Sequence, residues 1–108
     1  MHYELGRAHD IVALLWKFPL LSPPAKNVAN KVLWVSRLPT NGSPLTISAQ
    51  RMFGTKLKGP IVHRAVAGGP GPSYVNLPTS GCWHLDLSWS GHVDSLDLDY
   101  LAPSTRSP

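Results

Sequence analysis

The side chains best suited to chemistry gather near the C-terminus, in the segment GCWHLDLSWSGHVDSLDLDY over residues 81–100. His84 and Asp86 stand two residues apart, as do Asp97 and Asp99. Alternate residues of a strand point to one face, so two paired strands here gather an imidazole and three carboxylates. Such a set suits a divalent metal ion. It is also typical of an acidic strand face that is solvated or paired with arginine.

A turn between two strands sets which of these carboxylates meet. Gly91-His92 fits a two-residue type II′ hairpin turn, which has glycine at its first central position. This turn pairs Leu85 with Leu98 and Asp86 with Asp97, and a slip by one residue would place leucines opposite aspartates. Opposed carboxylates repel each other and need a cation. The candidates on neighbouring strands are Arg37, Arg51 and Lys31.

Motifs for catalysis or cofactor binding are missing from the sequence. The serines stand in no G-x-S-x-G pattern, and the glycine-rich segment 67–72 lacks the lysine and following helix of a phosphate loop. Cys82 is the single cysteine, which excludes an internal disulfide, and we expect it to be a small buried residue. We therefore predict no cofactor and a non-catalytic binding or protein-interaction module. The alternative is a small enzyme or metal-binding protein that uses the acidic hairpin face.

Four tryptophans provide the other chemical resource. Trp83 alternates with leucines, so we expect it in the core. Trp16 and Trp89 lack so clear a pattern. If exposed beside Tyr74 or the glycine-rich loop, they form the best candidate surface for a ligand.

The elements that position these residues are predicted to be strands. Hydrophobic residues make up 43% of the 108 residues, charged ones only 15%, and prolines and glycines interrupt the chain throughout, which favours short strands in one folded domain. We predict an all-β, immunoglobulin-like sandwich of two antiparallel sheets over residues 1–102, with a disordered tail at 103–108. About seven strands are expected, at residues 10–18, 31–38, 45–52, 59–66, 73–78, 82–90 and 93–101. The first, nearly all apolar, predicts a strand covered on both faces or a short helix.

Charge and hydropathy limit the partners and the location. Residues 1–81 hold nine basic and two acidic side chains, whereas residues 82–108 hold one and four, which predicts basic strands beside acidic ones. Without a Lys/Arg run, nucleic acid is not expected as a partner. The apolar segment 11–25 lacks a cleavage site and contains Lys17, so we expect neither a signal peptide nor a membrane span, and a cytoplasmic location by default. Two weakly charged segments, 61–66 and 74–77, predict a homodimer through an edge strand.

Three segments of the sequence carry a resemblance. They resemble a group of small uncharacterised bacterial proteins that share a Pro-Thr-x-Gly-Cys-Trp signature. The segments are KVLWVSR, LTISAQRMFG and LPTSGCWHLDLSWSGHVDSLDLDY. The signature falls here on residues 78–83. The resemblance implies an immunoglobulin-like β-sandwich, and many proteins of that group look exported or lipid-anchored. The group has no established catalytic residues, and this chain lacks the lipobox of its anchored members.

Overall fold

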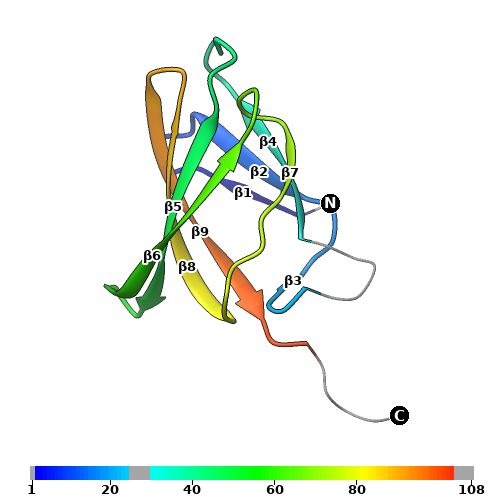
Figure 1. Cartoon of the computed structure of the whole chain (residues 1–108), viewed down its shortest axis with the longest axis vertical. Coiled ribbons are helices and arrows are strands. Elements are labelled where there is room, and N and C mark those ends of the chain that lie inside the picture. The colour runs from blue at the N-terminus through cyan, green and yellow to red at the C-terminus, as the bar shows by residue number, and fades with distance from the viewer. Residues whose placement is uncertain (1, 25–29, 104–108) are drawn as a thin grey trace.

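The computed structural model describes residues 2–24 and 30–103, and these residues form strands, turns and loops (Figure 1). Within this part of the chain no helix is long and apolar enough to cross a membrane. Most of the predicted tail, residues 104–108, lies outside the described residues. The strands are β1 (His2–Leu5), β2 (Ile11–Leu15), β3 (Leu20–Leu21), β4 (Lys31–Ser36), β5 (Leu45–Phe53), β6 (Lys56–Val66), β7 (Pro72–Tyr74), β8 (Gly81–Trp89) and β9 (His92–Leu101).

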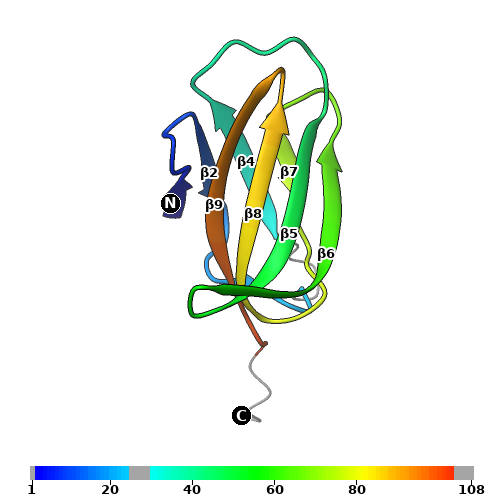
Figure 2. The ribbon, with the colours of Figure 1, turned by 90° about the vertical axis from the view of Figure 1, so that its left-hand side faces the viewer.

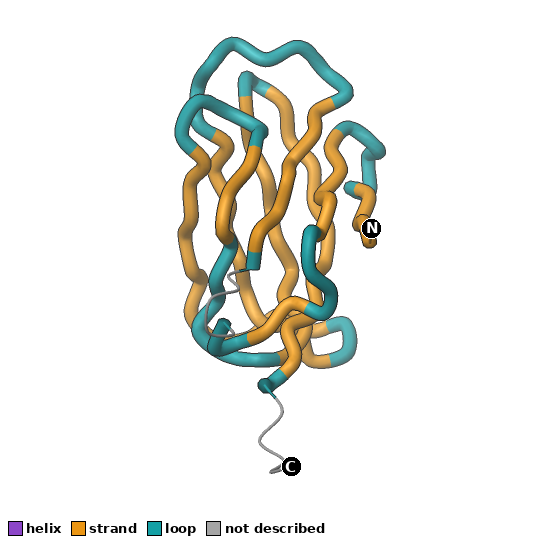
Figure 3. The backbone as a smooth tube through the Cα atoms, turned by 90° about the vertical axis from the view of Figure 1, so that its right-hand side faces the viewer, coloured by secondary structure: helices purple, strands orange, loops and turns teal. Residues whose placement is uncertain are grey.

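Two sheets pack face to face, which confirms the predicted sandwich. Strands β1-β2-β4-β7 form a four-stranded sheet, and β3-β9-β8-β5-β6 form a five-stranded one. Figure 2 faces the five-stranded sheet, and Figure 3 shows the opposite side of the sandwich. Strands β2, β4 and β7 take the positions of A, B and E in an immunoglobulin domain, and β5, β6, β8 and β9 take those of C, C′, F and G.

Two short strands correct the prediction of about seven antiparallel strands. β1, which we did not predict, pairs with β2 along the edge of the four-stranded sheet. β3 lies in a segment predicted to be a connection, and it pairs with the end of β9 in parallel. The chain thus leaves one sheet after Leu15 and joins the other at Leu20, so the predicted strand over residues 10–18 ends early.

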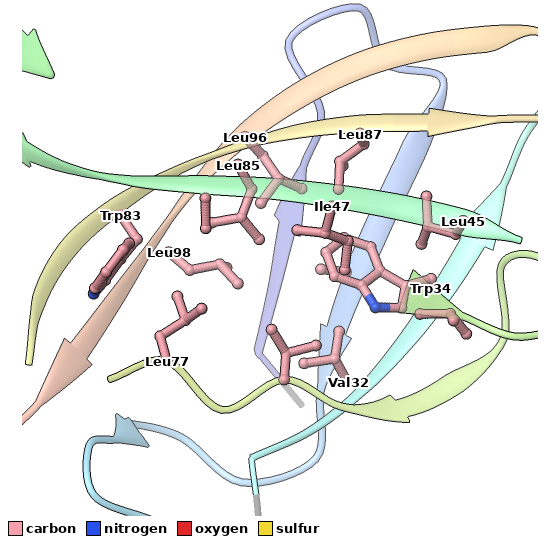
Figure 4. Close-up of a cluster of buried hydrophobic side chains, with 14 of the residues drawn as sticks. Val32, Trp34, Leu45, Ile47, Leu77, Trp83, Leu85, Leu87, Leu96 and Leu98 are labelled. Atoms are coloured by element: carbon pink, nitrogen blue, oxygen red, sulfur yellow. The ribbon is translucent and has the colours of Figure 1, made fainter. Parts of the chain in front are cut away.

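The core lies between the two sheets. On β5 the alternate apolar residues Leu45, Ile47 and Ala49 are all buried, whereas Thr46 between them is exposed. Trp83 and Trp34 also lie in this core, together with leucines of β8 and β9 (Figure 4). Alternating burial along β5, β8 and β9 is what a strand with one covered face requires.

The β8–β9 hairpin is paired two residues away from the predicted register. Its turn is Ser90-Gly91, with φ of 49° and 79°, and positive φ at both central residues is the property of a type I′ turn. The backbone N–H of Asn41 donates to Ser90 Oγ at 3.0 Å, which helps to hold this turn. Leu85 therefore pairs with Leu96 instead of Leu98. A shift of two residues leaves every side chain on its predicted face.

Candidate functional site

The outward face of the four-stranded sheet is almost entirely apolar. Its side chains form three rows across the strands, because residues that pair in an antiparallel sheet share a face. We name this surface the apolar outer face. It consists of Tyr3, Leu14, Leu33 and Pro72 in one row, Leu5, Val12 and Val35 in the second, and Trp16, Lys31 and Tyr74 in the third.

The aromatic residues of this face are open to solvent. Tyr3, Trp16 and Tyr74 are exposed by 61%, 49% and 64%. The only charged member is Lys31, whose Nζ lies 5.0 Å from the centroid of the Trp16 ring. The quadrupole of an indole ring attracts an ammonium group above it. The single charged side chain of this face therefore makes a cation–π contact with an aromatic neighbour.

The second strand shows why this face is unusual. Its run of apolar residues predicted a strand covered on both faces or a short helix, and the structure has a strand with only one covered face. Ile11 and Ala13 are buried between the sheets, whereas Val12 and Leu14 point outward and are half-buried by their neighbours alone. The solvated face of an antiparallel sheet is normally polar. Its contiguous exposed apolar surface makes this face a candidate interaction site.

The three predicted ligand-binding aromatics do not stay together. Trp16 and Tyr74 share a row of the apolar outer face. Trp89 does not join them, because it is buried in the core and its Nε1–H donates to Ser36 Oγ at 2.8 Å. Trp89 ends the inward-facing alternation of β8, and this pattern is the signal that could have assigned it to the core.

The acidic set on the five-stranded sheet is organised around His84. Its Nδ1 lies 2.8 Å from Asp97 Oδ1, and its Nε2 lies 3.1 Å from Asp86 Oδ1. Arg7 adds a second cation, with Nη2 at 3.1 Å from Asp97 Oδ2. Asp99 takes no part in these bonds, since it pairs in register with Cys82.

Two predictions about this set are therefore wrong. Asp86 lies opposite Ser95, because the type I′ turn shifts the register, and Asp97 lies opposite His84. The cations beside the carboxylates are also not the predicted ones. Arg37 pairs with Asp10 and Lys31 lies over Trp16, while the guanidinium of Arg51 lies over aromatic rings on the inner side of its sheet.

The side chains around His84 form a polar seam whose members already contact one another. Both imidazole nitrogens already face carboxylates, and among the described residues no group of three or more His, Cys, Asp or Glu side chains is arranged to hold a metal ion. Cys82 lies half-buried on the same face, which corrects the prediction that it is fully buried. Burial, with the charges of Asp97 and Asp99, raises the pKa of its thiol, so the reactive thiolate is disfavoured.

Asp94 is a buried carboxylate whose importance the sequence did not reveal. Its Oδ1 accepts the backbone N–H groups of Ala8 and Ser95, each at 2.8 Å, and its Oδ2 accepts that of Asp10 at 3.0 Å. Burial alone would raise the pKa of Asp94, but these N–H groups stabilise the charged form and lower it. A Cβ on Gly6 would lie 2.1 Å from Asp94 Oδ2, so this clasp also requires the glycine.

Fold and surface together define an immunoglobulin-like β-sandwich with one apolar outer face. The chain matches no protein-family model, no curated protein and no solved structure. The resemblance of residues 78–83 to the small bacterial proteins with a Pro-Thr-x-Gly-Cys-Trp signature stays a prediction. In this structure residues 78–80 precede β8 and residues 81–83 begin it.

Proposed function

We propose that this protein is a non-catalytic interaction module that binds another protein through the apolar outer face. One observation carries the proposal, namely the three cross-strand rows of exposed apolar side chains on a four-stranded sheet. Burying apolar surface contributes about 25 cal/mol per Å². A partner that covers this face would bury its apolar side chains, and that burial would stabilise the complex.

The composition of the face supports a protein partner. Tyrosine and tryptophan are enriched at the centres of protein interfaces, and charged residues are depleted there. Tyr3, Trp16 and Tyr74 provide aromatic anchors, and Lys31 is the single charge. A sheet offers a broad surface without a deep pocket, which suits a partner with a complementary apolar surface of its own.

A second copy of the chain is one such partner. The predicted homodimer uses edge strands, and β6 and β7, which contain Ile61 and Tyr74, do lie at the edges of their sheets. Tyr74 belongs both to an edge and to the apolar outer face, so contact through this region can combine strand pairing with apolar packing. The homodimer stays a prediction.

Photo-crosslinking tests the proposal in cells that make the protein. A benzoylphenylalanine at Tyr74 probes the apolar outer face, and one at Thr46, which is also exposed, probes the five-stranded sheet as a matched control. We expect a discrete crosslinked protein from position 74 and none from position 46. A product of twice 11.8 kDa identifies a second copy, and another mass identifies a different protein. Equal products from both positions, or none from position 74, would contradict the proposal.

A further inference from the structure

The turn end of the β5–β6 hairpin projects from the sandwich (Figure 1). Residues of this hairpin and of the segment before β8 line a groove. Its volume of about 760 Å³ falls within the range of small-molecule sites. The lining combines cations with apolar side chains, and those that matter here are Arg51, Phe53, Lys56, Lys58, Thr79 and Trp83. The groove is separate from the apolar outer face, since none of its lining residues belongs to that face.

The guanidinium of Arg51 is held in a fixed place in this groove. Its Nη1 donates to Thr79 Oγ1 at 3.0 Å. Its central carbon lies 4.7 Å from the centroid of the Phe53 ring and 5.9 Å from that of Trp83. Trp83 is fixed in turn, because its Nε1–H donates to the Thr79 carbonyl at 2.9 Å. Ordering such a long side chain costs entropy, which these contacts offset before any ligand arrives.

Gly81 provides the space for this arginine. A Cβ on Gly81 would lie 2.5 Å from Arg51 Nη2, and its φ of +128° is one that other residues rarely adopt. Thr79, Gly81 and Trp83 all belong to the Pro-Thr-Ser-Gly-Cys-Trp segment. This segment therefore positions Arg51 by a hydrogen bond, a missing side chain and an aromatic ring.

The charge in the groove is uncompensated. Arg51, Lys56 and Lys58 all line it, no acidic side chain does, and none of the ion pairs formed by the described residues includes any of the three. Lysines on an edge strand also hinder the pairing of edges between molecules. That role does not require an arginine fixed by Thr79 and Gly81, whereas a guanidinium positioned in advance favours recognition of an anion.

We propose that this groove binds an anion carried on a flat apolar body, such as an aromatic carboxylate or phosphate. Arg51, Lys56 and Lys58 hold the anionic group, since charge-assisted hydrogen bonds are the strongest that a groove of this kind can offer. The apolar body lies against Phe53, which is half-exposed, and the nearby Pro60 and Pro78.

Three probes of matched shape test the proposal, namely 2-naphthoate, 2-naphthyl phosphate and the neutral naphthalene-2-carboxamide. Each is titrated into the full chain, and NMR shifts of the Thr79 amide and the Trp83 indole N–H report binding in the groove. At least one anion should bind about tenfold more tightly than the carboxamide. The tighter of the two identifies the anionic group. Equal binding of the neutral probe, or no shift with either anion, would overturn the proposal.

Variants assign the binding to the fixed arginine. Arg51→Gln should weaken binding of the preferred anion about tenfold, whereas Lys17→Gln, which removes the same charge from an exposed loop, should leave it within about twofold. Lys58→Gln alters an exposed side chain that the core does not need, so it remains informative if Arg51→Gln fails to fold. Unchanged binding to Lys58→Gln, or an equal loss in Lys17→Gln, contradicts the proposal.

Discussion

The outward faces of the two sheets differ in polarity. On the five-stranded sheet the outward positions of β5 and β8 carry polar residues such as Thr46 and His84. On the four-stranded sheet the equivalent positions of β2 and β4 carry Leu14 and Leu33. Both sheets bury an apolar inner face in the same core, so the outward residues alone distinguish them.

The two faces also differ in whether their side chains find partners within the domain. The polar face satisfies its own charged groups, because Asp97 contacts both His84 and Arg7. The apolar outer face has only Lys31 over Trp16. Removing apolar side chains from water lowers the free energy. Among the described residues, nothing covers the exposed side chains of the apolar outer face. The comparison therefore supports the proposal that a partner contacts the four-stranded sheet.

The largest expected effect separates inner from outer leucines. Leu85→Ala removes a fully buried side chain from the shared core and should lower the free energy of unfolding by about 2–5 kcal/mol. Leu33→Ala, on the apolar outer face, should cost clearly less because its side chain is only half-buried. Urea unfolding of both variants gives the comparison. Equal midpoints for wild type and Leu85→Ala would show that the core assignment is wrong.

The clasp at Asp94 ranks next, because it ties the β1–β2 turn to the five-stranded sheet. Asp94→Asn replaces a charged acceptor of three backbone N–H groups and should cost about 1.5–3 kcal/mol at neutral pH.

The pH dependence identifies the charge of Asp94 as the cause. The pKa of Asp94 is lowered on folding, so its contribution is complete above the ordinary value of 3.8 and is lost as the pH falls through the lower, folded value. Unfolding curves of wild type and Asp94→Asn should therefore converge in this acidic range. A constant difference down to about pH 2 would exclude the carboxylate as the origin.

A smaller change in stability is expected from a charge placed on either outer face. Leu33→Lys and Ser88→Lys should each alter the free energy of unfolding by about 1 kcal/mol or less. Their effects on association should differ, because Leu33→Lys should abolish the product crosslinked from position 74 and Ser88→Lys should preserve it. Loss of that product in both variants would remove the distinction between the faces.

The smallest expected effect concerns metal on the polar face. A chelator should leave the melting temperature of the wild type unchanged, because His84 already lies between Asp86 and Asp97. Thermal unfolding with and without EDTA measures this, with Asp86→Asn as the control. A chelator-induced fall in the wild type that is absent from Asp86→Asn would instead establish a metal site.

The sequence by itself determined the fold class and most of the inward positions. Alternation at Leu45, Ile47 and Ala49, and again along β8 and β9, fixes which side chains enter the core, because successive residues of a strand point to opposite faces. The same rule placed His84, Asp86 and Asp97 on one outward face even though the predicted register was shifted by two residues. The alternation of side chains along a strand was therefore enough to predict these positions.

Tertiary structure decided which residues meet across long separations. Asn41 bonds to Ser90 in the hairpin turn, Asp94 accepts the backbone N–H of Ala8, and the guanidinium of Arg51 occupies the space that a Cβ on Gly81 would fill. No local pattern encodes these contacts, since each requires two segments to be brought together by the packing of the sheets. The sequence of β2 also could not predict whether its outward face is covered. An apolar run favours burial, but it does not show which part of the protein or of a partner covers it.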